Sequence, residues 1–318
     1  IIFVTFPIVF LSLLFCVKSS LAADYFSWET RVDRDGKPAG IFDVTPFPID
    51  ENTSSYIIRN DEFPNGKIYY LGTKYFVDGG YDGRNGSSDG SWDRPWTTIN
   101  TALTNVGIGN NTIIIRGAHN RWGNNFDGVY FGTYSLSNLA GTDDTHRFLL
   151  VGYGQERPVL DAGGSGFNIY RNSTTLRDAF ITVQRLKVQN TINTCIRMGW
   201  DVDGDKRSNY FNTIDVYLYS CGFNETNYTP TDGALYYLNV DNGWVFHSTV
   251  EKTYGHGYKI GDGSSNQIVE WSVAKNIGWW PGIPLVFRQS PVAFDFPVDT
   301  DARNQHDNII RYNISRFF

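Results

Sequence analysis

A short pattern of alternating apolar and polar residues recurs in the second half of the chain, and it restricts the possible folds more than any other feature. Four segments align on a central apolar residue: QRLKVQNT on Val188, DVYLYSCG on Leu218, HSTVEKTYG on Val250 and EWSVAKNIG on Val273. The spacings between these centres (188 to 218, 218 to 250, 250 to 273) are 30, 32 and 23 residues. A Gly-rich turn and a second short strand follow each segment, with no helical periodicity between them. This period predicts a solenoid, because stacked coils bury a core that one coil cannot bury alone.

The composition agrees with a β-rich chain and excludes one class of partner. The sequence of 318 residues has 32 Gly, 16% aromatic residues and a single Met, which favours strands and turns over long helices. The formal net charge is −6, and no run of basic residues stands out. We therefore expect no nucleic acid partner, since nucleic-acid binding depends on clustered positive charge.

Three stretches resemble a known family, the secreted right-handed parallel β-helix proteins, which include pectate-lyase-like polysaccharide lyases and glycoside hydrolases. The stretch KYFVDGGYDGRNGSSDGSWDRPWTTINTAL (74–103) resembles their opening module, in which a strand and a Gly/Asp loop lead into a capping helix. The stretch LLVGYGQERPVLDAGG (149–164) resembles an early coil, and the repeats follow from about Phe180. The resemblance implies an all-β fold, a right-handed parallel β-helix with an N-terminal capping helix. It is specific for the fold and not for an activity, because this scaffold carries many functions.

The chain divides into three expected parts. Residues 1–22 form an apolar run ending in Ser-Leu-Ala, which is typical of a signal peptide cleaved before Ala23, and this predicts a secreted or cell-surface protein. A retained membrane anchor or assembly segment is the alternative. Residues 23–73 are expected to be an N-terminal extension packed along the solenoid, and 74–318 the β-helix. The last residues, DNIIRYNISRFF, read as the start of another coil, so we expect the β-helix to be incomplete at its C-terminus and open to assembly with another chain.

Two further features bear on secretion. Cys16 lies in the expected signal peptide, so Cys195 and Cys221 remain, and the sequence leaves open whether they form a disulfide or are two buried thiols. Seven Asn-X-Ser/Thr motifs make a glycoprotein plausible. They begin at Asn52, Asn85, Asn110, Asn172, Asn224, Asn227 and Asn313.

The second strand of each repeat predicts a column of side chains on the outside of the solenoid. If the apolar residues of TCIRMG, GALYYL and GYKIG point inward, then Arg197, Tyr236 and Lys259 point outward. Neighbouring strands lie about 4.8 Å apart, so the three side chains should be stacked. His256 lies in the turn just before Lys259, and Pro284 is expected on the next rung.

These residue types suit the chemistry of an acidic sugar. β-Elimination of a uronate needs a cation at the carboxylate, a base for the neighbouring proton and an acid for the leaving oxygen. An ordinary solvated β face is the alternative for the same residues. Trp279 and Trp280, in the equivalent turn one coil later, would bind the substrate by stacking on sugar rings. The candidate catalytic residues are Arg197, Tyr236, His256 and Lys259.

A second column is expected on the strand before the turn. It would contain Arg185, Asp215, His247 and Glu270 as a surface ladder of alternating charges. The alternative interpretation is that His247 and Glu270 form an acid–base pair.

One acidic loop suggests a metal. Asp201, Asp203 and Asp205 alternate around Gly204, and hard oxygen ligands at this spacing suit Ca²⁺. The EF-hand pattern is not met, because Asn212 stands where that motif requires Glu. A simple Asp/Gly turn is the alternative.

These observations predict a secreted carbohydrate-active protein that cleaves acidic polysaccharide by β-elimination or hydrolysis. Calcium-dependent β-helix lyases place several acidic residues beside a Lys or Arg, and this sequence shows no such cluster around Lys259. Two non-enzymatic alternatives remain. One is a glycosylated adhesin or filament subunit, assembled through the N-terminal segment or the open solenoid end. The other is a sugar-binding module.

Overall fold

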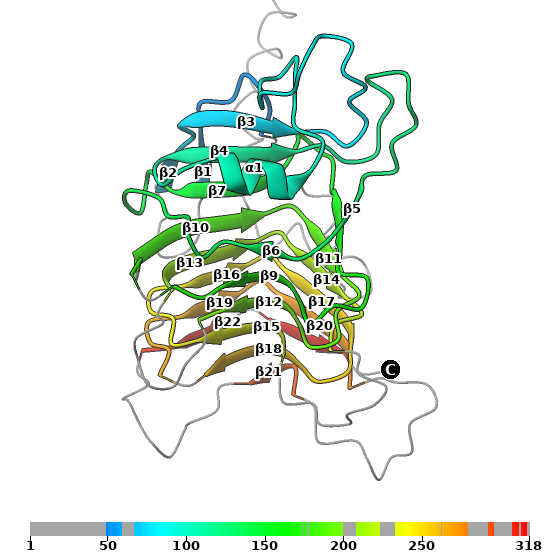
Figure 1. Ribbon diagram of the computed structural model, residues 1–318. Helices are drawn as coiled ribbons and strands as arrows, with labels where there is room; N and C mark the ends of the chain where they lie inside the picture. The colour runs from blue at the N-terminus through cyan, green and yellow to red at the C-terminus, as the bar shows by residue number, and fades with distance from the viewer. Residues whose placement is uncertain are drawn as a thin grey trace, which may run out of the picture.

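Three parallel sheets run side by side along one axis, and the chain visits them in turn to form the coils of a parallel β-helix (Figure 1). This confirms the predicted fold class. The structure is a computed structural model. It describes residues 49–58, 67–173, 175–176, 178–199, 208–222, 233–261, 263–278, 292–295, 307–311 and 313–316.

Each complete coil contributes one strand to each sheet. Sheet I consists of β3 (Thr73–Val77), β4 (Asn111–Ile115), β7 (Phe148–Gly152), β10 (Asp178–Gln184), β13 (Asn209–Ile214), β16 (Trp244–Phe246), β19 (Ile268–Glu270) and β22 (Ile309–Arg311). Sheet II consists of β5 (Val129–Phe131), β8 (Val159–Asp161), β11 (Lys187–Gln189), β14 (Tyr217–Tyr219), β17 (Thr249–Thr253), β20 (Val273–Ile277) and β23 (Ile314–Arg316). Sheet III consists of β6 (Tyr134–Ser135), β9 (Phe167–Arg171), β12 (Thr194–Met198), β15 (Gly233–Leu238), β18 (His256–Gly261) and β21 (Phe294–Asp295).

The repeat therefore has three strands, where the sequence predicted two. The two predicted strands belong to sheets II and III, and the strand of sheet I was missed. Sheet I is covered on both faces over its first strands, so β7 is buried at all five positions and shows no alternation. A strand buried on both faces reads as a continuous apolar run, which is hard to recognise by its period.

Sharp corners separate the sheets, and residues with left-handed backbone stack at each corner. After sheet II this column is Asn190, Ser220, Lys252 and Asn276, with φ between 53° and 59°. A non-glycine residue in this conformation costs roughly 1–2 kcal/mol, and Asn tolerates it better than most. The recurrence of Asn at these corners in the repeats follows from this backbone requirement.

The fourth repeat is shifted by one residue from its predicted alignment. Val188, Leu218 and Val250 stack as expected, but Val250 pairs with Ala274 and not with Val273. Both residues are apolar, so the alternation alone could not distinguish the two registers. A slip of one residue moves every side chain of a strand to the opposite face.

The outer face of sheet I is covered by an antiparallel hairpin of β1 (Ser55–Ile58) and β2 (Lys67–Tyr70). Tyr56 and Tyr69 of the hairpin share an apolar cluster with Leu149 and Phe246 of sheet I. This hairpin is the described part of the expected N-terminal extension. The expected signal peptide, 1–22, lies outside the described residues.

A helix of 7 residues, α1 (Ile99–Asn105), closes the N-terminal end of the core. Thr98 caps it by accepting a hydrogen bond from the Thr101 amide, and Ile99 and Ala102 are buried among core residues. The helix contacts β3 and β6, as expected of the predicted capping helix (Figure 1). Within the described residues, no helix has the length and apolar character needed to cross a membrane.

Candidate functional site on sheet III

The outward column on sheet III has the geometry that the sequence predicted. Arg197 pairs with Tyr236, and Tyr236 pairs with Lys259, on the adjacent strands β12, β15 and β18. The alternate residues Ile196 and Leu235 are fully buried in the core. The strands therefore place these three side chains on one outer face, at neighbouring rungs.

The three stacked side chains are in direct contact. The Arg197 guanidinium carbon lies 5.4 Å from the centre of the Tyr236 ring, and Lys259 Nζ lies 4.6 Å from it. Arg197 also lies 5.3 Å from the ring of Phe167. Tyr236 is only 5% exposed, whereas Arg197 and Lys259 are half-buried. The column presents two cations held against aromatic rings, a desolvated setting in which a positive charge attracts an anion strongly.

An acidic residue that the sequence analysis missed completes the column. Asp295 of β21 pairs with Lys259, and its Oδ2 lies 3.3 Å from Nδ1 of His256. β21 reaches this position because Gly257 donates its amide hydrogen to Val292 O at 2.9 Å. A Cβ atom on Gly257 would lie 2.5 Å from Ala293 O, so a side chain there would displace β21.

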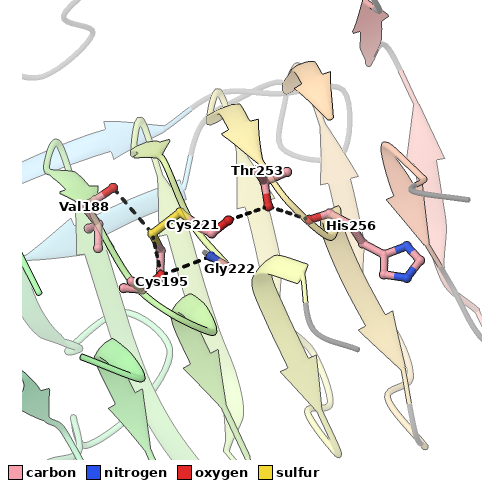
Figure 2. Close-up of a disulfide and its surroundings, with 7 residues drawn as sticks. Val188, Cys195, Cys221, Gly222, Thr253 and His256 are labelled. Carbon is pink, nitrogen blue, oxygen red and sulfur yellow. Dashed lines mark hydrogen bonds between the residues drawn. A yellow bond between two sulfur atoms is a disulfide. The ribbon is translucent and has the colours of Figure 1, made fainter. Parts of the chain in front are cut away.

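A disulfide lies next to this site and resolves the alternative that the sequence left open. Cys195 of β12 is bonded to Cys221, which follows β14 in the next coil, and both are buried (Figure 2). The Thr253 hydroxyl donates to Cys221 O at 3.0 Å and lies 3.4 Å from His256 O. Figure 2 shows the His256 ring pointing away from the disulfide. The bridge thus anchors the corner from which β18 starts and positions the His256 backbone.

Two members of the column were not predicted. Tyr170 of β9 pairs with Arg197, and the stretch FNIYR around it alternates like TCIRM, so an extension of the repeat by one coil would have found it. The prediction of Pro284 on the rung after Lys259 is wrong, because Asp295 occupies that rung. The spacing of the repeats did not predict β21, because a long insertion precedes this strand.

The second predicted column is not a surface ladder. Arg185, Asp215 and His247 do stack at a corner, but they are 2%, 1% and 2% exposed. Asp215 Oδ1 lies 2.7 Å from Arg157 Nη2, and Asp215 Oδ2 lies 3.4 Å from Arg185 Nε. The prediction of a solvated face was wrong because the loop that carries Arg157 covers this corner.

Glu270 does not belong to that column. The one-residue shift of the fourth repeat places Trp271 at the corner after His247. The Glu270 carboxylate accepts from Trp244 Nε1 at 2.9 Å and from Arg311 Nε at 2.7 Å, while His247 faces Asp215 at 3.8 Å. The predicted His247–Glu270 acid–base pair is therefore not formed by this arrangement.

Several predicted site residues lie outside the described part of the chain. They include the candidate sugar-stacking residues Trp279 and Trp280, and the candidate calcium ligands Asp201, Asp203 and Asp205. Among the described residues, no group of three or more His, Cys, Asp or Glu side chains could hold a metal ion.

The sequons differ in accessibility. Asn52 and Asn85 are exposed, and Asn110 and Asn172 are half-buried. The Asn313 amide donates to Val269 O at 2.7 Å and its oxygen accepts from the Ser272 amide at 2.8 Å, so a glycan there would disrupt existing hydrogen bonds. Asn224 and Asn227 lie outside the described residues.

No protein-family model matches the sequence, and no curated protein matches it either. Among solved structures, a rhamnogalacturonan lyase superposes with a TM-score of 0.50 at 10% sequence identity, over 77% of this chain and 68% of the lyase. An alginate lyase from Paenibacillus sp. str. FPU-7 gives a TM-score of 0.42 at 15% identity, over 68% of this chain and 72% of the lyase. A GH136 lacto-N-biosidase from Eubacterium ramulus gives 0.43 at 9% identity, over 76% of this chain and 56% of the enzyme.

These comparisons bear on the architecture. The likeness to the rhamnogalacturonan lyase shows a shared β-helix fold, and the other two superpositions are too weak to support an argument. At this level of identity a common fold does not carry over an activity, because activity depends on the side chains of the site.

Proposed function

We propose that this protein is a secreted carbohydrate-active β-helix protein that cleaves an acidic polysaccharide at the outer face of sheet III. The observation that carries the proposal is the in-register column of Arg197, Tyr236 and Lys259, with the His256–Asp295 pair at its last described rung. The column runs along the solenoid axis, so a polymer lying along it would meet a new side chain at each rung, about 4.8 Å apart. The rhamnogalacturonan lyase that shares the architecture is consistent with this substrate class.

β-Elimination is the reaction that these residues serve best. A base removes the proton next to the uronate carboxylate, a carbon–carbon double bond forms, and the bond to the leaving sugar oxygen breaks as that oxygen takes up a proton. Arg197 would stabilise the negative charge that develops on the carboxylate, and Lys259 or His256 would act as the base. His256 Nδ1 lies 3.3 Å from Asp295 Oδ2 and 3.4 Å from the Val292 amide nitrogen, so Nε2 is the ring nitrogen that would face a substrate.

Hydrolysis is the less favoured reaction. Glycoside hydrolases of the usual kind need two carboxyl groups on either side of the scissile bond. On the described strands of sheet III, Asp295 is the only acidic residue. Elimination needs cations and a base, which this face provides, whereas hydrolysis needs a pair of carboxylates. The single carboxylate therefore favours elimination.

A non-enzymatic function is the second candidate, and the burial of Tyr236 favours it. With 5% exposure, Tyr236 offers little of its ring to a substrate, and its two cationic neighbours lie over that ring. In this case the column would stabilise the sheet, and the protein would bind polysaccharide as a surface adhesin without cleaving it.

The Lys259→Ala substitution distinguishes these functions. We would incubate the protein with a panel of uronate polymers and follow the ultraviolet absorbance of the unsaturated ends that elimination produces. The wild type should generate this signal on at least one polymer, and Lys259→Ala should lose at least about a hundredfold in rate, the range expected for loss of an acid–base group.

The matched control is Arg94→Ala, which removes a cation from the capping loop, where Arg94 pairs with Asp89 on the surface. Its rate should equal that of the wild type. Absence of an unsaturated product on every polymer, or an unaltered rate in Lys259→Ala, would exclude Lys259 from a lyase mechanism and favour the adhesin.

The disulfide supports the proposed extracellular location. Disulfides persist in oxidising compartments and are rare in the cytosol, where thiols are kept reduced. Mass spectrometry of the natural protein, with thiols alkylated before any reduction, should find Cys195 and Cys221 unmodified. The same experiment would reveal whether the chain begins at Ala23, and whether the exposed sequons at Asn52 and Asn85 carry glycans.

We also propose that the segment 201–207 binds Ca²⁺ through Asp201, Asp203 and Asp205, which alternate in sequence between β12 and β13. If so, calcium should raise the melting temperature of the wild type and leave that of Asp203→Asn unchanged, while Mg²⁺ should have little effect. Calorimetric titration of calcium into both proteins measures the same site, and equal heats would rule it out.

A further inference from the structure

A cluster of lysine and tyrosine side chains occupies the outer face of sheet II. Sheet II lies next to sheet III along the solenoid (Figure 1). All of its members are half-buried, so each keeps some surface open to solvent. We call it the sheet II cation face, and its residues are Lys187, Tyr217, Tyr219, Glu251, Lys252 and Lys275.

Two of the lysines are held by aromatic rings. Lys187 Nζ lies 4.9 Å from the ring centre of Tyr219 and 5.7 Å from that of Tyr217. Lys252 Nζ lies 5.3 Å from the Tyr219 ring and donates to its hydroxyl at 3.0 Å. Among the described residues, Lys187 has no carboxylate within ion-pair distance. Ring contacts position an ammonium group but leave its full charge in place, so an external anion can still bind it.

The carboxylates of this face already have partners. Glu251 Oε2 accepts from the Tyr217 hydroxyl at 2.6 Å and lies 2.8 Å from Lys275 Nζ. Asp161, at the start of the same column, is 7% exposed, and the amides of Gln189 and Asn190 donate to it at 2.7 and 2.6 Å. Lys275 pairs with Glu251, and Lys252 also interacts with that carboxylate. The three lysines of the face outnumber the carboxylates of Glu251 and Asp161, so this face carries a positive excess on a chain whose net charge is −6.

We propose that the sheet II cation face binds an anionic polysaccharide of the uronate class, as a second binding surface beside the column on sheet III. The cations and hydrogen-bonding groups recur on successive rungs about 4.8 Å apart, so they form an extended strip and not a single pocket. Lysines suit the carboxylates of such a polymer, and the tyrosine hydroxyls and Gln189 suit the sugar hydroxyls between them.

The mixture of positive and negative side chains on the sheet II cation face indicates which kind of polymer it would bind. A nucleic acid presents a dense row of phosphates, and carboxylates such as Glu251 and Asp161 on the same face would repel it. A polyuronate carries hydroxyl groups between its carboxylates and can satisfy both kinds of side chain. The substrate class rests on the proposed function. Since sheets II and III follow each other in every coil, a polymer held on sheet II would raise the local concentration of substrate at sheet III.

The test compares polymer binding by three variants. We would measure affinity for sodium polygalacturonate and sodium alginate by gel electrophoresis through polymer-containing gels, with a neutral galactan as the uncharged probe. Lys187→Gln/Lys252→Gln should bind on the order of tenfold more weakly than the wild type and lose part of the salt dependence. Lys187→Arg/Lys252→Arg keeps both charges and should bind like the wild type. Arg94→Gln removes a cation from the capping loop and should also bind like the wild type.

Wild-type affinity in Lys187→Gln/Lys252→Gln would overturn the proposal, as would equal binding of the neutral galactan or stronger binding of a single-stranded polynucleotide. The two proposals can fail separately. Lys259→Ala should retain polymer binding, because it leaves sheet II intact. A protein that binds polyuronate through these lysines but generates no unsaturated ends would refute the lyase function and keep the binding surface.

Discussion

Asp215 is a carboxylate with almost no contact with water, and basic side chains surround it at the corner between sheets I and II. Burial by itself would raise its pKa. The nearby His247 imidazole and the charges of Arg157 and Arg185 outweigh this effect and lower the pKa of Asp215 below its usual range. Burial also lowers the pKa of Arg185 to about 10, in spite of the attraction of Asp215. This cluster holds charges that no longer interact with solvent, so its loss should be costly.

At the scale of the residue, we therefore expect a large effect of Asp215→Asn on stability. The substitution leaves Arg185 buried without its counter-charge, which should lower the free energy of unfolding by about 3–5 kcal/mol. Asp89→Asn breaks a surface pair with Arg94, in which both side chains are more than 40% exposed. This substitution should change the free energy of unfolding by less than about 1 kcal/mol. Urea unfolding of both variants makes the comparison, and similar losses would contradict the buried cluster.

The same cluster predicts a dependence of stability on pH. Because folding lowers the pKa of Asp215, its contribution is present above the ordinary carboxyl pKa of about 4 and is lost as the pH falls through the folded value. The acid-side decline in the free energy of unfolding should therefore be shallower in Asp215→Asn than in the wild type. Denaturant titrations at several pH values between neutral and acidic measure this slope. Equal slopes in the wild type and in Asp215→Asn would contradict the prediction.

At the scale of the element, the strands of sheet III are those that the sequence describes best. β12, β15 and β18 have one face in the core and one face outside, so their alternation correctly predicted which side chains would form the column. The strands of sheet I show no such alternation, because the hairpin covers their outer face. The strand β21 could not be placed by spacing, since a long insertion precedes it. Local periodicity therefore predicts a strand only where one face is buried and the other faces solvent.

The disulfide joins two such elements, and its removal should destabilise both. Cys195 and Cys221 are 26 residues apart, and a loop of this size stabilises a fold by about 3 kcal/mol through restriction of the unfolded chain. We expect Cys195→Ala/Cys221→Ala to lower the melting temperature and to reduce cleavage, because loss of the bridge would displace His256. Calorimetry and the absorbance assay measure these two effects. Full stability after both thiols are removed would argue against a structural bridge.

At the scale of the whole molecule, stacking explains what could and could not be predicted. The solenoid, its capping helix and the lateral contact of Arg197 with Tyr236 follow from a repeat period and the pleat of a strand. The burial of the Asp215 corner could not be predicted, because it depends on a loop from another coil that carries Arg157. The covering of sheet I likewise depends on a hairpin remote in sequence. Contacts between coils follow from the period, and contacts made by loops do not.

The register of the column is independent of the length of chain between its members. Arg197, Tyr236, Lys259 and Asp295 are separated by 39, 23 and 36 positions, yet each pairs with the next on an adjacent strand. Insertions and deletions in the intervening loops can therefore accumulate during evolution without shifting the column by a single rung. A protein built this way can change the segments between these strands while the column stays in register, and duplication of one coil would extend the column by one more position.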